Sequence, residues 1–149
     1  MTRYVLLDSG PLGLLTVARA RPETQECTRW LAGLLARETK VVLPEIADYE
    51  VRRELLRLAS GNGISQLDQL QGVLLYVPIT TEAMRYAARL WAEVRRRGRP
   101  TADPHALDAD VILAAQALTL ATQADDVVIA TTNVRHLALF ADARPWRAI

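Results

Sequence analysis

The chain has 149 residues, half of them hydrophobic, and a formal net charge of +1. This length suits one domain, residues 1–149, with a substantial core, and the charge excludes the strong overall field of a polycationic nucleic-acid binder. No apolar stretch reaches the roughly 20 residues of a membrane helix, so we expect no membrane partner. The single cysteine, Cys27, excludes an internal disulfide and fits a reducing compartment, so we expect a cytoplasmic protein.

Short apolar runs alternate with helical patterns along the chain. Residues 4–7 form the first run, which ends on Asp8 and turns through a Ser-Gly-Pro sequence. A run this short, bounded by Gly and Pro, is typical of a strand buried on both faces of a parallel sheet. Later runs of the same character cover residues 40–43, 74–79 and 127–130, and helical patterns cover residues 12–18, 23–37, 45–59, 64–71, 81–97 and 109–121.

This alternation predicts a fold of the α/β class, a three-layer α/β/α sandwich with a central parallel sheet and right-handed crossovers. Glycine, proline, aspartate and histidine within residues 98–107 predict a loop that leads into Asp108. Thr80 or Thr81 is expected to cap the helix over residues 81–97. The face of this helix that is expected to point inward contains Met84, Ala87, Ala88, Trp91 and Val94.

Carboxylates are expected to meet at one edge of the predicted sheet. Asp8 follows the first strand, residues 45–50 follow the second, and residues 131–133 end the last, while Asp108 and Asp110 begin a crossover helix that can reach the same edge. Carboxylates that share one cleft raise each other's pKa by repulsion. A hard divalent cation such as Mg²⁺ or Mn²⁺ relieves this repulsion with oxygen ligands. The sequence therefore predicts a metal site at this edge.

Each of these acids also has a purely structural interpretation. Asp8 is also suited to cap the next helix by accepting its backbone N–H groups. Glu50 is expected to point near the buried face of its helix, where an unpaired acid is costly. Its structural alternative is a pair with Arg53, three residues later, or an exposed position at the rim. Asp108 and Asp110 are two residues apart and cannot share a helix face. We expect Asp108 to be the N-cap and Asp110, in the first turn, to be the ligand.

Four stretches of the sequence contain the residues of interest in order: VLLDSGPLGLL with Asp8, PEIADYEVRREL with Glu50, DADVILAAQAL with Asp110, and VIATTNVRHLALF with residues 131–133. Together they resemble PIN-domain proteins, specifically the VapC-like toxins of bacterial toxin–antitoxin systems. The resemblance spans nearly the whole chain. It implies a PIN-like fold and a metal-dependent endoribonuclease in which Asp8, Glu50 and Asp110 hold Mg²⁺ or Mn²⁺ and water attacks an RNA phosphodiester. It also implies an RNA substrate, a cognate antitoxin protein and a homodimer.

Asn133 departs from the family pattern, because many relatives have a fourth aspartate at this position. An asparagine can ligate a metal through its carbonyl or hold a water, but it carries no charge, so one resident ion and two both stay open. The expected catalytic residues are Asp8, Glu50, Asp110 and Asn133, with supporting roles for Ser9, Asp108, Thr131 and Thr132.

Two other functions are compatible with parts of this pattern. One is a catalytically weak or inactive PIN-like module that binds RNA or protein. The other is an aspartyl-phosphate phosphatase, which also places an Asp after its first strand but usually needs a second Asp two residues later, where this chain has Gly10. The basic run of Arg95, Arg96, Arg97 and Arg99 is either a solvated helix end, whose charges complement the helix dipole, or a patch that contacts RNA phosphates.

Overall fold

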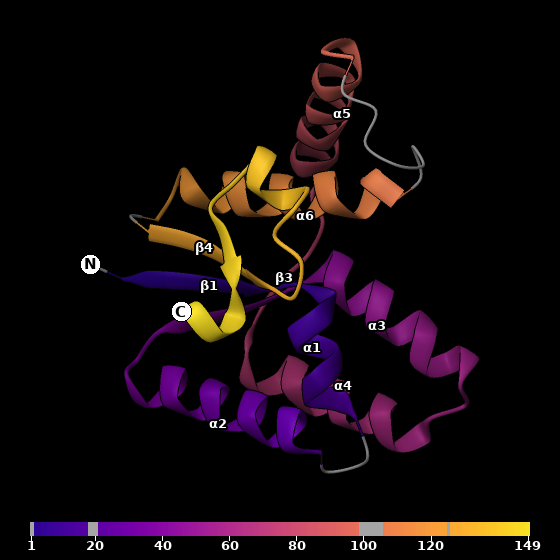
Figure 1. The fold of residues 1–149 in the computed structure, drawn as a ribbon, viewed down its shortest axis with the longest axis vertical. Coiled ribbons are helices and arrows are strands. Elements are labelled where there is room, and N and C mark those ends of the chain that lie inside the picture. Colours follow the sequence, from indigo (N-terminus) through magenta and orange to yellow (C-terminus); the bar gives the residue numbers. More distant parts are fainter. Residues whose placement is uncertain (1, 18–20, 99–105, 125) are drawn as a thin grey trace.

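A parallel sheet of five strands forms the centre of the molecule in the computed structural model, which describes residues 2–17, 21–98, 106–124 and 126–149 (Figure 1). The strand order is β3-β2-β1-β4-β5, and every neighbouring pair is parallel. The strands are β1 Arg3–Leu7, β2 Lys40–Pro44, β3 Leu75–Val77, β4 Asp126–Thr131 and β5 Ala143–Pro145.

Helices cover both faces of this sheet, which confirms the predicted three-layer sandwich. In Figure 1, α1, α2 and α4 lie on one side of the strands and α5 and α6 lie on the other. The helices are α1 Ser9–Thr16, α2 Pro22–Ala36, α3 Glu45–Arg57, α4 Gly61–Val73, α5 Thr81–Arg96 and α6 Ala106–Ala121, with short 3₁₀ turns η1 Leu137–Leu139 and η2 Trp146–Ala148. Among the described residues, no helix is both long and apolar enough to cross a membrane.

The central strand β1 is apolar on both sides because both of its faces are covered. Val5 and Leu7 belong to the core on the side of α1, α2 and α4, whereas Leu6 belongs to the core on the side of α6, and all three are fully buried. This alternation follows from the two-residue period of a strand. It explains why the strand appears in the sequence as a continuous apolar run.

The strand order places the residue after β1 at a point where the chain changes direction across the sheet. From β1 the chain continues to β2 on one side, and β4 lies on the other side. Leu7 of β1 is in register with Ala130 of β4, so Asp8 follows at the level of Thr131. In open α/β sheets, the crevice at such a switch point is where ligands bind. The topology therefore positions Asp8 at the expected edge.

Two predictions about helices were wrong. Helix α6 begins at Ala106, so Asp108 lies within its first turn and is not its N-cap, and Asp110 lies beyond that turn. On α5, Met84 is 46% exposed and Ala88 is also exposed, although both were expected to point inward. The buried residues of α5 are Ala83, Ala87 and Val94. The buried stripe is narrow because α5 packs mainly on α6, so that one side of the helix is covered.

The fifth strand was not predicted from the sequence. Residues Ala143–Pro145 contain an arginine and a proline and are partly exposed, so they lack the apolar run that marks the other strands. The strand pairs with β4 through register partners Ile129 with Ala143 and Thr131 with Pro145. It leads into Trp146, which is only 2% exposed and packs edge-on against Trp30 with ring centroids 5.5 Å apart. The edge strand therefore carries a core residue back to the sheet.

Candidate active site

Asp8 joins the end of β1 to the start of α1 and to the end of β4. Its Oδ1 accepts a hydrogen bond from the backbone N–H of Ser9 at 2.7 Å, so Asp8 is the N-cap of α1. Its Oδ2 accepts from the hydroxyl of Thr131 at 2.6 Å, and its own N–H donates to the carbonyl of Ala130 at 3.0 Å. The structural role considered for Asp8 is therefore present. A carboxylate has lone pairs beyond these two bonds, so capping leaves room for a further ligand.

Thr131 connects Asp8 to the turn that follows β4. The Thr131 side chain is fully buried and also accepts a hydrogen bond from the backbone N–H of Asn133 at 3.0 Å. The side-chain oxygen of Asn133 in turn accepts from the N–H of Arg135 at 3.2 Å, and Asn133 is exposed. Asn133 thus forms the kind of side-chain turn for which asparagine is favoured. Its predicted role in catalysis stays a prediction.

Gly10 and Thr132 are in close contact across the same edge. A Cβ built on Gly10 would lie 2.3 Å from Oγ1, 2.7 Å from Cγ2 and 3.0 Å from Cβ of Thr132. Rotation of the threonine side chain cannot relieve the last of these contacts, because the Cβ position is set by the backbone. The missing side chain at Gly10 therefore lets the turn after β4 pack directly on the first turn of α1. The sequence interpretation treated Gly10 only as a turn residue and missed this contact.

Glu50 lies on α3, the helix that follows β2, and its carboxyl group is half-buried. Burial, together with the negative charges of Asp8 and Asp110, raises the pKa of Glu50 to about 7, while Arg53 acts in the opposite direction. Asp8 and Asp110 therefore both act electrostatically on Glu50, although burial is the larger cause of its raised pKa. Among the described residues, no ion pair joins Glu50 to Arg53, so the pairing considered as the structural alternative is not formed. The Arg53 guanidinium lies over the ring of Tyr49, 5.1 Å from its centroid.

Asp110 approaches the same edge from α6. Burial and the charge of Asp8 raise the pKa of Asp110 to about 6, and His136 acts against this rise. The sequence gave no reason to place His136 here, because its position depends on the turn after β4 folding back towards α6. Asp108 is exposed. The structure therefore brings Asp8, Glu50 and Asp110 into electrostatic contact and leaves Asp108 at the surface.

The chemistry of these side chains suits a hard divalent cation, but their positions do not form a closed cage. Within the described ranges, no group of three or more histidine, cysteine, aspartate or glutamate side chains is arranged so that it could hold a metal ion. Mg²⁺ is usually bound by only one or two carboxylates and keeps several waters, so a closed cage is not required. Carboxylate oxygens are the ligands that such a cation prefers, so metal binding by one or two of these acids stays a prediction.

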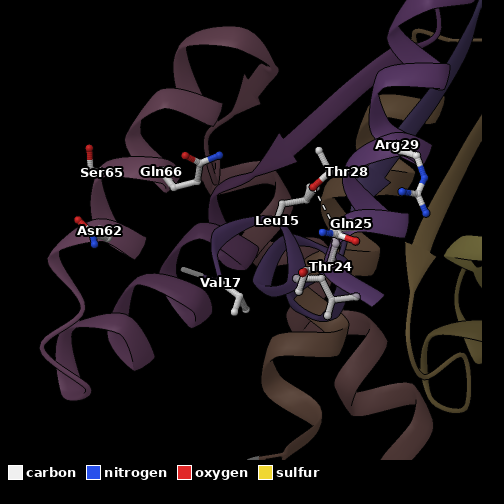
Figure 2. Close-up of a pocket in the computed structure, with 10 residues that line it drawn as sticks. Leu15, Val17, Thr24, Gln25, Thr28, Arg29, Asn62, Ser65 and Gln66 are labelled. Atoms are coloured by element: carbon white, nitrogen blue, oxygen red, sulfur yellow. Dashed lines mark hydrogen bonds between the residues drawn. The ribbon is translucent and has the colours of Figure 1, made fainter. Parts of the chain in front are cut away.

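A hollow between α2 and α4 lies away from the acids. Figure 2 shows Thr24, Gln25, Thr28 and Arg29 of α2 on one side of it and Asn62, Ser65 and Gln66 of α4 on the other. The hollow has a volume of about 830 Å³ and contains none of the predicted catalytic residues.

Of the predicted RNA contacts, Arg95, Arg96 and Arg97 lie exposed at the end of α5, and Arg99 lies outside the described residues.

Comparisons with known proteins found similarity in structure. No protein-family model matches the sequence, and no curated protein is similar to it in sequence. VapBC2 from Rickettsia felis, bound to a DNA fragment from its promoter, matches with a TM-score of 0.69 and 14% identity over 96% of this chain and 98% of the other. VapBC-1 from nontypeable Haemophilus influenzae matches with a TM-score of 0.67 and 16% identity over 97% of this chain and 98% of the other. DNA-bound VapBC from Salmonella typhimurium matches with a TM-score of 0.61 and 17% identity over 98% of this chain and 99% of the other.

These matches define the class of fold. The five-stranded parallel sheet with its flanking helices is the PIN-domain fold of the VapC neighbours, and the match covers nearly the whole chain. Four sequence motifs indicated a resemblance to VapC-like proteins. The structural matches confirm this resemblance at the level of the fold.

The pKa of Glu50 leads to a first testable prediction. A carboxyl group whose pKa is raised by folding binds more protons in the folded than in the unfolded state, so its contribution to stability is lost as the pH rises from about 4.5 to about 7. Glu50→Gln stays neutral throughout. We expect the melting temperature of metal-free Glu50→Gln, relative to the parent protein, to increase between roughly pH 5 and pH 8.

Glu54→Gln is the matched control on the same helix. Arg57 lowers the pKa of Glu54 below 4.5, so the relative melting temperature of Glu54→Gln should fall as the pH rises towards about 4.5 and stay constant from pH 5 to pH 8. Calorimetric melting curves across the pH range measure both trends. If Glu50→Gln followed the trend of Glu54→Gln, the repulsive environment described for Glu50 would be wrong.

The contact between Gly10 and Thr132 leads to a second prediction. Gly10→Ala should lower the free energy of unfolding by about 1–3 kcal/mol, because the added methyl group overlaps Thr132. Gly13→Ala, on the same helix and with no atom within 4 Å of the new Cβ, should be neutral or stabilise by up to about 1 kcal/mol. Thr132→Gly in the Gly10→Ala background should restore part of the loss. Equal stability of the two alanine variants in urea unfolding would contradict this interpretation.

Proposed function

We propose that the chain is a metal-dependent endoribonuclease and the toxin of a toxin–antitoxin pair, with RNA as substrate and Mg²⁺ or Mn²⁺ as cofactor. The observation that carries this proposal is the meeting of Asp8, Glu50 and Asp110 at the switch point of the sheet, where each of the last two has a raised pKa. Acids with shifted pKa values cluster at functional sites more often than elsewhere. The VapC-like fold supports the same reaction class.

Asp8 is the residue best placed to hold the cation. It is fixed from two directions by Ser9 and Thr131, so its carboxylate has a defined orientation before any ligand binds. Glu50 and Asp110 would complete the negative cluster, directly or through water. A bound divalent cation lowers the pKa of water and offsets the charge that develops on a phosphodiester.

The protonation of Glu50 gives it a second possible task. With a pKa of about 7, Glu50 exchanges a proton readily near neutral pH in the absence of metal. A cation beside it would favour the carboxylate, so metal binding should release protons. In this proposal Glu50 holds the cation or accepts a proton from the attacking water.

Asp8→Asn is the central test. The Asn side chain can still accept from Ser9, and its amide can donate to Thr131, so the metal-free fold should be as stable as that of the parent protein or more stable. Cleavage of RNA with Mg²⁺ or Mn²⁺ should fall by at least about a hundredfold, since one ligand charge is lost. Cleavage assays with and without metal, beside melting curves, measure both effects.

Asp110→Asn and Asp108→Asn form a matched pair on one helix. Asp110→Asn should lose cleavage in the same way, whereas Asp108→Asn should retain most of it because Asp108 is exposed in the first turn of α6. Full activity of Asp8→Asn would exclude the nuclease mechanism and favour a binding module of the same fold. An inactive Asp108→Asn beside an active Asp110→Asn would reverse their assigned roles.

The partners proposed are a cognate antitoxin and a second copy of the chain. The antitoxin is supported by the VapBC complexes among the structural neighbours. Homodimerisation is supported by exposed apolar side chains on α3, where Tyr49 is 56% and Leu56 is 64% exposed. Light scattering should give a dimer at tens of micromolar, and Leu56→Glu should shift it towards monomer. A parent protein that is monomeric under these conditions would exclude the homodimer.

A further inference from the structure

Helix α5 carries a row of arginines on the side opposite to its packed face. Arg85, Arg89 and Arg96, here called the α5 stripe, are all exposed and fall within about 40° of one another on a helix of 3.6 residues per turn. The buried residues Ala83, Ala87 and Val94 lie on the far side, against α6. In Figure 1, α5 projects beyond α6 at the top of the view.

The α5 stripe forms no ion pair within the described part of the chain. Arg97, at the end of the same helix, pairs with Glu93, and exposed arginines elsewhere pair with carboxylates, as Arg57 does with Glu54. No ion pair joins a stripe residue to any described carboxylate. Residues 81–97 contain five arginines and two glutamates, which gives a net charge of +3. A concentrated positive charge therefore lies on a chain whose formal net charge is only +1.

Aromatic side chains lie against Arg89 of the stripe and against Arg95, a neighbouring arginine outside the stripe. The guanidinium of Arg89 lies 5.1 Å from the ring centroid of Tyr86, and that of Arg95 lies 5.5 Å from the ring centroid of Trp91. Such stacking keeps a guanidinium extended and leaves its N–H groups free to bind an anion. Less side-chain entropy is then lost when a phosphate binds.

We propose that the α5 stripe is a docking surface for the phosphate backbone of RNA, separate from the acid cluster. This inference rests on the proposed function, because it concerns the same RNA substrate. Arg85 and Arg89 lie about 6 Å apart along the helix axis, and the whole row spans about 16 Å. Stacked nucleotides advance about 3.4 Å each along a strand, so the row matches roughly five nucleotides.

An extended polyanion fits this surface better than a protein partner does. The row is straight and carries three positive charges, which suit the regularly spaced phosphates of a nucleic-acid strand, whereas protein interfaces are anchored by buried apolar and aromatic residues. The helix α6, which carries Asp110, lies between the stripe and the sheet (Figure 1). An RNA that reaches both must therefore extend beyond the nucleotides at the acids.

The test is the salt dependence of RNA binding by Arg85→Gln/Arg89→Gln/Arg96→Gln. The probe is a labelled oligouridylate of about 20 nucleotides in EDTA, so that binding is measured without metal or cleavage. Each phosphate contact contributes about 0.7 to the slope of log K against log salt for a single strand. The triple variant should lose about 2 from this slope and bind several-fold more weakly at low salt.

The matched control is Arg57→Gln/Arg144→Gln/Arg147→Gln. It removes the same charge from exposed arginines that already pair with carboxylates. This control should keep the parent slope, and melting curves should show that both variants are folded at the temperature of the binding assay. Equal slopes for the two variants would overturn the proposal. So would a stripe variant that binds RNA normally but loses binding to poly-L-glutamate, which would indicate an acidic protein as the partner.

This experiment separates the docking surface from the proposed reaction. Binding in EDTA does not depend on the acids, so a chain that failed to cleave RNA but showed the reduced slope in the stripe variant would keep the docking surface and lose the nuclease. If the parent protein cleaved RNA but the stripe variant kept the parent slope, the nuclease would be kept and the docking surface would be lost.

Discussion

The 2.6 Å hydrogen bond between the hydroxyl of Thr131 and the carboxylate of Asp8 ties together the ends of two neighbouring parallel strands. Thr131 is fully buried, and Asp8 is held on its other oxygen by the N–H of Ser9. A buried hydroxyl that lost this partner would leave an unsatisfied polar group, which costs about 1–3 kcal/mol. The orientation of Asp8, and with it the geometry of the acid cluster, depends on this bond.

The cluster is unfavourable in the absence of a ligand. Burial and the charge of Asp8 push the pKa values of Glu50 and Asp110 upward to about 7 and about 6, so the metal-free protein prefers to hold protons at this edge. Proteins retain such repulsive groups at functional sites, where a substrate or cation relieves the repulsion. Within this account, the same repulsion that weakens the metal-free fold strengthens the binding of a divalent cation.

The sequence was sufficient for those parts of the site that depend on strand ends. A short apolar run that stops on Asp8 predicts both a buried parallel strand and the position of the acid, because the carboxyl ends of parallel strands share one edge. It was insufficient where a position depends on contacts between distant segments. The packing of Gly10 on Thr132 and the approach of His136 to Asp110 leave no local pattern, and both arise only when the turn after β4 folds back.

The two errors on helices have a related cause. Aspartate is a favoured N-cap, so the sequence interpretation started the helix at Asp108, whereas α6 begins two residues earlier at Ala106. On α5 the apolar pattern was wider than the surface that α6 covers, so that Met84 points outward. In both cases local preference was overridden by packing that sequence periodicity does not contain.

The central claim is that this edge of the sheet binds a divalent cation through Asp8. The most direct measurement is anomalous diffraction from a crystal soaked with Mn²⁺, beside a crystal of Asp8→Asn treated in the same way. The account predicts an anomalous peak about 2 Å from a carboxylate oxygen of Asp8 and on the side of Glu50 and Asp110, absent in the variant. A map with no peak at this edge, or the same peak in Asp8→Asn, would contradict it.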